Sequence, residues 1–430
     1  MATRCCPALF IGAPGSNHGK TTVTAALARH HVASGRKVVV FKTGPDFLDP
    51  MMLARASGHP VRQLDLWLAG EAACRQMLYA AAKDADLILI EGVMGLFDGT
   101  PSSADLAALL GIPVVVVIAA TGMAQTFGAI AAGLANYRSD LAIAGVVANS
   151  VASKRHEDML LQGMPAALPY LGGVYRDARF ALPHQHLGLL PAAAVANLDA
   201  RLDAAAACIA PLALAALPAA VAFNDPGCTS PPRLLQGVRI GVARDAAFLF
   251  LYPENLSLLV AMGATLHFFS PLADATLPEV DSLYLPGGFP ELHLTALQDN
   301  RAMHAALRCH VQAQRPLYAE CGGLLYLLDS LTDQHGHCAT MSALLPGDAR
   351  MQQRLQGLGY QTAPMPGGSL RAHTFHYSAL TMGMAPAAVG ERRFETSAAE
   401  AIYQHHRIIA TYLHCYFPSN PAAAAQLFLP

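Results

Sequence analysis

The chain has 430 residues, which is too long for one ordinary domain and favours two compact domains with sizeable cores. It carries 28 Lys and Arg against 30 Asp and Glu, a net charge of -2, so nothing in its overall charge attracts nucleic acid or an anionic membrane. Its nine cysteines show no CxxC spacing, which fits neither a zinc site nor a disulfide framework. An anionic ligand must therefore be bound by a local site, and a reducing compartment is expected.

Neither a signal peptide nor a membrane span is expected from the sequence. The first residues, MATRCC, run directly into an apolar segment without the features of a signal peptide, so the protein is expected in the cytoplasm. Residues 204–223 are apolar, but Pro211 and Pro218 interrupt them. Residues 112–120 are too short to cross a bilayer and are typical of a buried parallel strand. No membrane partner is expected.

The first half of the chain alternates short apolar or β-branched runs with longer Ala- and Leu-rich stretches of helical character. That alternation predicts βαβ units and a parallel sheet. The expected strands are residues 8–11, 37–41, 87–90, 114–118 and 143–148.

A glycine-bearing loop follows the first expected strand and reads GAPGSNHGKTT from Gly12 to Thr22. A strand, such a loop and a helix start are what a phosphate-binding loop requires, because backbone N–H groups converge there on the anion. Lys20 is expected to reach the outer phosphates of a nucleotide, and Thr21 a magnesium ion. Pro14 stands where the standard pattern has glycine, so this is a variant loop, and a chance GKT in a turn is the alternative.

Two acidic segments follow later strands of the same domain. TGPDFLDP contains Asp46 and Asp49, and ILIEGVMGLFDG contains Glu91 and Asp98. Each strand leads directly into a glycine-containing turn, so these acids are expected at the carboxyl edge of the sheet. Magnesium and a phosphoryl intermediate both need carboxylates there. Capping of helices or turns is the alternative for any single acid, but it explains all four poorly.

Residues 225–236, DPGCTSPPRLLQ, concentrate Pro, Gly and Ser between apolar segments and are expected to be a linker. A first domain of residues 1–224 with the phosphate loop precedes it, and residues 237–430 form the expected second domain. The second domain begins another alternating series, which predicts a second open α/β sheet. Its expected strands are residues 238–242, 265–268, 282–285 and 316–319.

The second domain contains a candidate thiol nucleophile. RPLYAECGGLLYLLD places Cys321 after a strand, before two glycines and at a helix start, as in a nucleophile elbow. A helix N-terminus lowers a thiol pKa and supplies N–H donors for an oxyanion, which attack on a carboxamide needs. LPGGFPELH, residues 285–293, offers further donors, and His414 at an expected strand end is the candidate base. A buried inert thiol is the alternative for an isolated cysteine.

These segments, in this order, resemble the cobyrinate (hydrogenobyrinate) a,c-diamide synthase family over nearly the whole chain. The matching segments are GKTTVT, KTGPDFLDP, LDLW, EGVMGLFDG, SADLA, GMAQT, VVANSV, HLGL, RDAAF, YPENL, LPGGFPE, ECGGLLYL, FHYS and YLHCYF. The resemblance implies a P-loop, dethiobiotin-synthetase-like α/β domain joined to a class I glutamine amidotransferase domain of flavodoxin-like α/β fold. It implies a carbon–nitrogen ligase that uses ATP, Mg²⁺ and glutamine. The substrate would be a corrin, whose a- and c-acetate carboxylates are amidated in cobalamin biosynthesis.

The resemblance also implies roles for particular residues. The nucleotide-binding set is Gly15, Gly19, Lys20, Thr21, Thr22 and Asn149, the last at the position that recognises adenine. The catalytic acids of the synthetase site are Asp46, Asp49, Glu91 and Asp98, and the metal ligands are Thr21, Asp46 and Glu91. Cys321 matches the thiol nucleophile, and His414 matches the histidine that raises its nucleophilicity.

Several positions depart from the family pattern. Phe47 stands where Tyr is common, Ala119 where many members have Asp, and Thr374 where the family often has Glu. The acid that usually lies two residues after the histidine of a class I triad is also missing after His414. The third member of the triad therefore stays unassigned, and His376 in FHYS is a competing candidate for the base.

Three alternative functions stay open. Another tetrapyrrole, such as nickel-sirohydrochlorin, would be amidated by the same chemistry. A nucleotide-switch protein needs no glutaminase, so Cys321 and His414 argue against it. A degenerate enzyme that acts as a scaffold is the third alternative, because Ala119 and Thr374 depart from the family pattern.

A homodimer is compatible with the sequence, which does not determine the oligomeric state. Candidate substrate contacts, or otherwise a solvated basic loop, are Tyr175, Arg176, Arg179, His184 and His186.

Overall fold

The computed structural model of the protein describes residues 2–180, 184–185, 188–189, 191–227, 229–394 and 399–430. Contacts between Cα atoms divide the chain into two compact units, Met1–Cys228 and Thr229–Pro430. The predicted linker, residues 225–236, spans this division, and Leu235 near its end is fully buried in the core of the second unit. Within the described residues, no helix is both long enough and apolar enough to cross a membrane.

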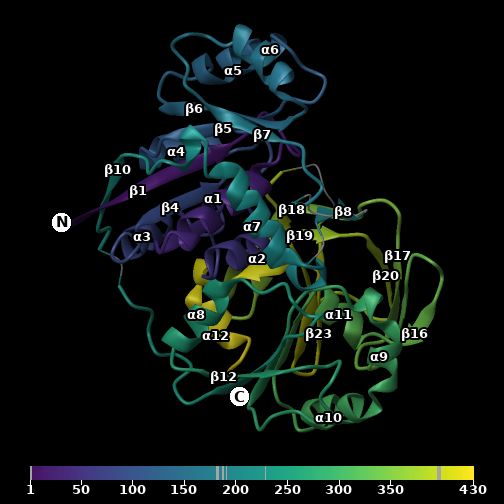
Figure 1. Ribbon diagram of the computed structural model, residues 1–430. Helices are drawn as coiled ribbons and strands as arrows, with labels where there is room; N and C mark the ends of the chain where they lie inside the picture. The colour runs from purple at the N-terminus through teal and green to yellow at the C-terminus, as the bar shows by residue number, and fades with distance from the viewer. Residues whose placement is uncertain (1, 181–183, 186–187, 190, 228, 395–398) are drawn as a thin grey trace. The chain divides into compact units, whose positions relative to one another are not determined.

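The first unit is an α/β domain in which strands and helices alternate along the chain (Figure 1). Its strands are β1 (Thr3–Gly12), β2 (Val38–Lys42), β3 (Arg62–Gln63), β4 (Leu87–Glu91), β5 (Val114–Ala119), β6 (Ile143–Val151), β7 (Tyr170–Tyr175), β8 (His184–Gln185), β9 (Gly188–Leu189) and β10 (Ala220–Asn224). Its helices are α1 (Lys20–Ala33), α2 (Leu48–Ser57), α3 (Glu71–Ala81), α4 (Ser103–Leu110), α5 (Thr126–Asn136), α6 (Lys154–Gln162) and α7 (Leu198–Ile209).

One sheet organises the first unit, in the order β3-β2-β4-β1-β5-β6-β7, with β10 paired antiparallel to β1. The pairs along that order are parallel. Alternate strand residues point to opposite faces, so Phe10 packs in the core with α3, α4 and α5, whereas Leu9 packs in the core with α1, α2 and α7. Two apolar cores therefore enclose the sheet, which explains why its strands are apolar on both faces.

The strand order brings the predicted nucleotide-site segments to one edge of this sheet. β2, β4 and β1 are neighbours, so the loops that follow them meet at the same carboxyl edge. Lys42 at the end of β2 lies opposite Glu91 at the end of β4, and Glu91 lies opposite Ile11 of β1. Lys20 begins α1 after the loop that follows β1.

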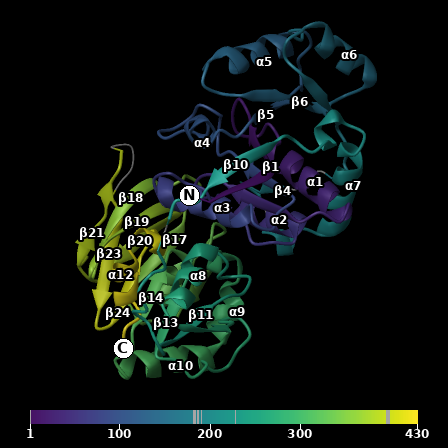
Figure 2. The same cartoon turned by 90° about the vertical axis from the view of Figure 1, so that its left-hand side faces the viewer.

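The second unit is also an α/β domain, with added antiparallel strands (Figure 2). Its strands are β11 (Arg239–Ala243), β12 (Thr265–Phe269), β13 (Ser282–Leu285), β14 (Leu317–Glu320), β15 (Ser330–Thr332), β16 (Cys338–Thr340), β17 (Gly347–Met351), β18 (Gly357–Met365), β19 (Gly368–His376), β20 (Ser378–Met382), β21 (Ala388–Val389), β22 (Glu391–Arg392), β23 (Ala401–His405), β24 (Ile408–Thr411) and β25 (His414–Tyr416). Its helices are α8 (Pro253–Ala261), α9 (Leu294–Asp299), α10 (Arg301–Gln312), α11 (Gly322–Leu327) and α12 (Pro421–Gln426).

The central sheet of the second unit has the order β12-β11-β13-β14-β24-β23-β21. It is parallel from β12 to β24, and β23 and β21 extend it antiparallel. Helices α8 and α12 pack in the core of one face, and α9, α10 and α11 in the core of the other. Since β13, β14 and β24 are neighbours, the segments that follow them meet at one carboxyl edge.

The predicted fold class, two α/β domains built on largely parallel sheets, is confirmed, and each predicted strand is present. Two four-stranded sheets of the second unit, β16-β15-β17-β20 and β22-β18-β19-β25, were not predicted. They hold the FHYS segment and the strand that begins with His414.

Candidate active sites

The loop between β1 and α1 leads from a strand into a helix start, as a phosphate-binding loop does. Gly19 caps α1 with a φ of 91°, and a Cβ at this position would lie 2.0 Å from the Nδ2 of Asn149. Only glycine fits there. The Nδ2 of Asn149 donates a hydrogen bond to the carbonyl of His18 over 3.0 Å, so this side chain also holds the loop in place.

Lys20 is buried at the start of α1 and points back along the loop. Its Nζ donates to the carbonyl of Gly15 over 2.9 Å and to the carbonyl of Met94. Burial lowers the pKa of Lys20, and the Lys42 cation adds to that effect. A phosphate group that entered the loop would supply the negative charge that favours the protonated lysine.

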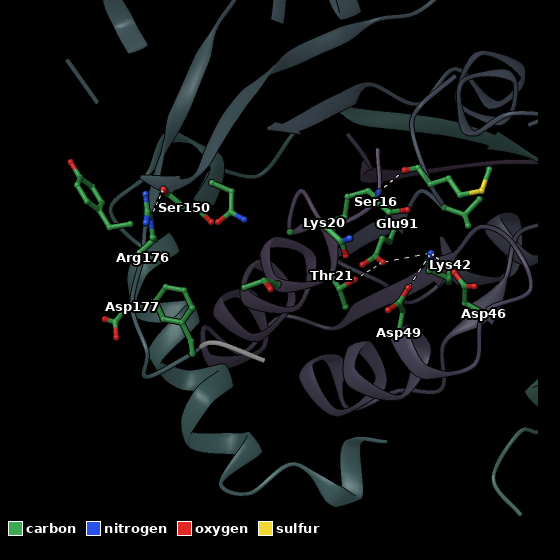
Figure 3. Close-up of a pocket in the computed structure, with 18 of the residues that line it drawn as sticks. Ser16, Lys20, Thr21, Lys42, Asp46, Asp49, Glu91, Ser150, Arg176 and Asp177 are labelled. Carbon is green, nitrogen blue, oxygen red and sulfur yellow. Dashed lines mark hydrogen bonds and ion pairs between the residues drawn. The ribbon is translucent and has the colours of Figure 1, made fainter. Parts of the chain in front are cut away.

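Lys42 is a site residue that the sequence interpretation missed. Its side chain is 2% exposed, and its Nζ lies 3.0 Å from Asp46 Oδ2, 3.4 Å from Asp49 Oδ2 and 3.6 Å from Glu91 Oε1. Burial opposes its charge, but the three carboxylates outweigh burial and raise the pKa of Lys42. The structure therefore brings Asp46, Asp49 and Glu91 together, as predicted from their strand ends, around a lysine cation (Figure 3).

Glu91 links this cluster to the phosphate loop. The hydroxyl of Thr21 donates to Glu91 Oε1 over 2.9 Å, while Glu91 Oε2 is buried without a hydrogen-bond partner among the described residues. Burial raises the pKa of Glu91 to about 7. Within the described part of the chain, no group of three or more His, Cys, Asp or Glu side chains could hold a metal ion. Mg²⁺ bound with ATP needs only one or two protein ligands, because phosphates and water complete its shell, and Thr21 with Glu91 fits that need. Asp46, the third predicted metal ligand, lies 3.0 Å from the Nζ of Lys42, and its role at the metal stays a prediction.

Asp98 lies apart from this cluster. Its carboxylate accepts a hydrogen bond from the backbone N–H of Gly95 over 2.8 Å, within its own turn. It is not among the residues that line the cavity beside the phosphate loop. Its predicted catalytic role therefore has less geometric support than those of Asp46, Asp49 and Glu91.

The cluster and the phosphate loop border a cavity of about 1010 Å³. Gly19, Thr22 and Asn149 also line it. Ser150 and Arg176 lie on the opposite side from Lys42, and the Arg176 guanidinium donates to the Ser150 carbonyl over 3.1 Å (Figure 3). A cavity of this size is large enough for a nucleotide.

Some of the predicted substrate contacts line this cavity and others do not. Tyr175 lines the cavity with Arg176, and its hydroxyl donates to Glu157 over 2.8 Å. Arg179 is an exposed residue paired with Asp177. His186 lies outside the described residues, and His184 is described only as part of β8.

Replacing Lys42 by Met is expected to lower the free energy of unfolding by about 3 kcal/mol, because breaking a buried ion pair leaves uncompensated charge. Equilibrium unfolding in urea measures the change. The control is Lys37→Met, since Lys37 lies 3.9 Å from Asp84 on the exposed surface. That control is expected to change stability by less than about 1 kcal/mol. Equal losses in both variants would show that Lys42 does not hold the carboxylates together.

The second site is centred on Cys321, at the junction of β14 and α11. Its backbone has a φ of 44° and a ψ of -105°, a strained conformation for a residue with a Cβ. Its N–H donates to the carbonyl of Thr411 over 2.8 Å, which ties the junction to the neighbouring strand. The predicted elbow geometry is thus present, since a sharp strand-to-helix turn carries the thiol.

The environment of the thiol differs from the expectation. Burial raises the pKa of Cys321, and the carboxylate of Glu291 raises it further. The hydrogen bond from the Gly322 N–H lowers the pKa of the thiol, but this effect is smaller than the effect of burial. The prediction that the helix start lowers the thiol pKa was therefore wrong for the substrate-free protein, because desolvation dominates. The raised pKa favours the protonated thiol in the substrate-free protein.

The diglycine turn after β13 contacts both the elbow and His414. A Cβ at Gly287 would lie 2.3 Å from the Cε1 of His414, and a Cβ at Gly322 would lie 2.9 Å from the nitrogen of Gly288. The absence of side chains at these glycines lets the turn, the elbow and the histidine pack together. His414 is buried, and burial lowers its pKa to about 3, with added repulsion from His373 and His376. The imidazole of the substrate-free protein is therefore neutral, which is the form that a general base must have.

Two acids near the elbow were not assigned from the sequence. Glu320, the residue before Cys321, is fully buried and accepts hydrogen bonds from Tyr284, Tyr318 and the N–H of Cys415. It anchors β25 to β14. Glu291 follows the diglycine turn, and burial raises its pKa to about 7. The segments ECGG and LPGGFPE contain both acids, but nothing in their spacing shows that they are buried.

Comparison with known proteins identifies the two domains that contain these sites. Residues 9–189 match the CobQ/CobB/MinD/ParA nucleotide binding domain, and residues 239–422 match the CobB/CobQ-like glutamine amidotransferase domain. Together with the phosphate loop and the cysteine elbow, these matches define a glutamine-dependent, amide-forming ligase with a nucleotide-binding domain.

Full-length relatives narrow this class to a family. The chain is 57% identical over 430 residues to the hydrogenobyrinate a,c-diamide synthase of Stutzerimonas stutzeri, covering 100% of both chains. It is 57% identical to the protein of that name from Pseudomonas aeruginosa, covering 100% of this chain and 99% of the relative. It is 46% identical over 425 residues to the cobyrinate a,c-diamide synthase of Herminiimonas arsenicoxydans, covering 98% and 96%. The chain belongs to the family of hydrogenobyrinate and cobyrinate a,c-diamide synthases.

Proposed function

We propose that this protein uses ATP and glutamine to amidate the a- and c-acetate carboxylates of hydrogenobyrinate. The observation that carries the proposal is the pairing of a phosphate-loop carboxylate cluster with a cysteine elbow in a chain whose relatives act, by name, on such corrins. Hydrogenobyrinate is preferred to cobyrinate because relatives named for it are 57% identical, against 46% for one named for cobyrinate.

The synthetase chemistry is assigned to residues 1–224. A substrate carboxylate attacks the γ-phosphorus of ATP and ADP departs, which leaves an acyl phosphate. Ammonia then attacks the acyl carbon, inorganic phosphate leaves, and the amide remains. Lys20 and Lys42 offset the negative charge of the phosphates and carboxylates, the main requirement of phosphoryl transfer. Mg²⁺, when held by Thr21 and Glu91, would neutralise charge on the transferring phosphoryl group.

The glutaminase chemistry is assigned to residues 237–430. His414 accepts the proton of the Cys321 thiol, and the thiolate attacks the carboxamide carbon of glutamine. The oxyanion is stabilised by backbone N–H groups near the diglycine turn and Gly322. His414 returns the proton to the leaving nitrogen, ammonia departs, and water hydrolyses the remaining thioester to glutamate.

The direct test incubates the purified protein with ATP, glutamine and a panel of tetrapyrrole acids, followed by mass spectrometry. Hydrogenobyrinate is expected to gain two amides, and cobyrinate and nickel-sirohydrochlorin to react more slowly. Preferential amidation of another member of the panel would reassign the substrate within the same chemistry. Amidation of none of them would reject the proposal.

MgATP binding is expected to release protons near neutral pH. Burial raises the pKa of Glu91 to about 7, so the carboxyl is partly protonated there. Mg²⁺ bound beside it would favour the carboxylate, so affinity should rise as the pH increases through that value. Calorimetry in buffers of different ionisation enthalpy measures the released protons. The same proton release from a Glu91→Gln variant would contradict this assignment.

His414→Ala is expected to reduce glutamine hydrolysis by roughly a hundredfold or more, the usual scale for a general acid–base group. Ammonia-dependent synthesis should persist, because the synthetase chemistry does not use this histidine. His405→Ala, at an exposed position in β23, serves as the control. Near-normal hydrolysis by His414→Ala would mean that another group deprotonates Cys321.

Cytoplasmic location is also proposed. The cysteines that the structure describes, Cys5, Cys6, Cys74, Cys208, Cys309, Cys321, Cys338 and Cys415, are all free, which supports a reducing compartment. A homodimer remains a proposal that light scattering at several protein concentrations would test.

A further inference from the structure

His376 and Glu400 form a buried pair in the second unit. The Nε2 of His376 lies 3.0 Å from Glu400 Oε1, and the two side chains are 9% and 10% exposed. The Nδ1 of His376 lies 2.9 Å from the carbonyl oxygen of Ser378, which can only accept a hydrogen bond. Both ring nitrogens of His376 therefore face oxygen atoms that can accept a hydrogen bond.

The surrounding strands are shaped to hold this pair. A Cβ at Gly357 would lie 2.3 Å from His376 Nε2 and 2.5 Å from Glu400 Oε1, so a glycine is needed there. Thr374 is fully buried and donates its hydroxyl to Glu400 Oε1 over 2.9 Å. The Glu400 N–H donates to Gln361 Oε1 over 2.9 Å. Three strand residues therefore provide space and hydrogen bonds for one ion pair.

Tyr412 connects the pair to the thiol site. The rings of His376 and Tyr412 stack with centroids 3.6 Å apart and planes 4° apart. The hydroxyl groups of Tyr412 and Ser378 are 2.7 Å apart. Tyr412 follows Thr411, whose carbonyl accepts the Cys321 N–H over 2.8 Å, and it precedes His414 by two residues. The ion pair therefore fixes the segment that contacts the nucleophile and carries the base.

We infer that Glu400 and His376 are positioning residues of the glutaminase: Glu400 holds His376, and His376 holds Tyr412 and the 411–414 segment. The inference rests on the proposed function. It also accounts for Thr374, which stands at a position where the family often has a glutamate. Here the carboxylate comes from Glu400, on another segment, and meets the Thr374 hydroxyl in the same pocket.

The test begins with Glu400→Gln, which keeps the shape and hydrogen-bonding capacity of the side chain but removes its charge. The kcat for glutamine hydrolysis is expected to fall by roughly tenfold to a hundredfold with less than about a threefold change in KM, because substrate binding is not touched. Ammonia-dependent synthesis should stay at the wild-type rate. Glu391→Gln, at an exposed position in β22, is the matched control and should hydrolyse glutamine normally.

A second substitution tests whether the charge of Glu400, and not only its shape, positions His376. Adding Thr374→Glu to Glu400→Gln returns a carboxylate to the pocket. The double variant is expected to recover roughly a third or more of the lost kcat, because His376 regains a carboxylate partner. Normal hydrolysis by Glu400→Gln, or no rescue by the double variant while ammonia-dependent synthesis is intact, would overturn the inference. Absence of glutamine hydrolysis in the wild-type protein would instead reject the proposed function.

Discussion

Cys321→Ala is expected to abolish glutamine-dependent amide synthesis while leaving synthesis from ammonium salt intact. The thiol at the elbow can form the glutamyl thioester, whereas the carboxylate cluster lies in the other unit. Ammonia is the only species that the two reactions need to share. The loss with glutamine should therefore reach the detection limit, a decrease of roughly ten-thousandfold or more for a nucleophile.

Parallel assays with glutamine and ammonium chloride measure this separation. Cys309→Ala is the control, because Cys309 is an exposed cysteine in α10. It should retain both activities. Equal loss of both activities in a folded Cys321→Ala protein would show that Cys321 supports the synthetase and is not the glutaminase nucleophile.

Glu91→Gln is expected to reduce the kcat of synthesis by roughly a hundredfold or more with either nitrogen donor. The physical reason is that Glu91 contacts both Thr21 of the phosphate loop and the Lys42 cation, so one neutral substitution alters the charge of the whole cluster. The KM for glutamine should change little, because glutamine is hydrolysed by the other unit.

Glu71→Gln is the control for this substitution, since Glu71 pairs with Arg75 on an exposed part of α3. Steady-state kinetics with ammonium chloride removes the glutaminase from the comparison. If Glu91→Gln turned over at a near-normal rate, Glu91 would be a structural partner of Lys42 and not part of the reaction site.

The parallel sheets were predictable from the sequence because their strands are short and apolar on both faces, as in Leu87–Glu91 and Val114–Ala119. The carboxyl edges then followed, since parallel neighbours end on the same side. The antiparallel strands β18 and β19 were not predicted. Their buried and exposed residues do not form one clean alternating pattern, and glycines lie among them.

The clustering of Asp46, Asp49 and Glu91 could be predicted, because each of them follows a predicted strand. Lys42 was missed because a lysine at a strand end is usually solvated, and only the structure shows it buried among carboxylates. The raised thiol pKa was missed for a similar reason, since the helix start is visible in the sequence but desolvation of Cys321 is not.

The His376–Glu400 pair shows a further limit of sequence reasoning. His376 lies in β19 and Glu400 in a distant segment, and no local sequence pattern links the two. From the sequence alone, Thr374 suggests that the site has no carboxylate at this point. The geometry shows instead that a carboxylate from elsewhere in the chain reaches the Thr374 hydroxyl.

The most direct measurement follows the side-chain nitrogen of glutamine. Hydrogenobyrinate is incubated with the protein, MgATP and glutamine that carries a heavy nitrogen isotope in its carboxamide, and the products are analysed by mass spectrometry. The proposed function predicts a diamide with the heavy isotope in both new amides, formed only when ATP is present. Glutamine hydrolysis and ATP turnover without isotope in any tetrapyrrole product would contradict it.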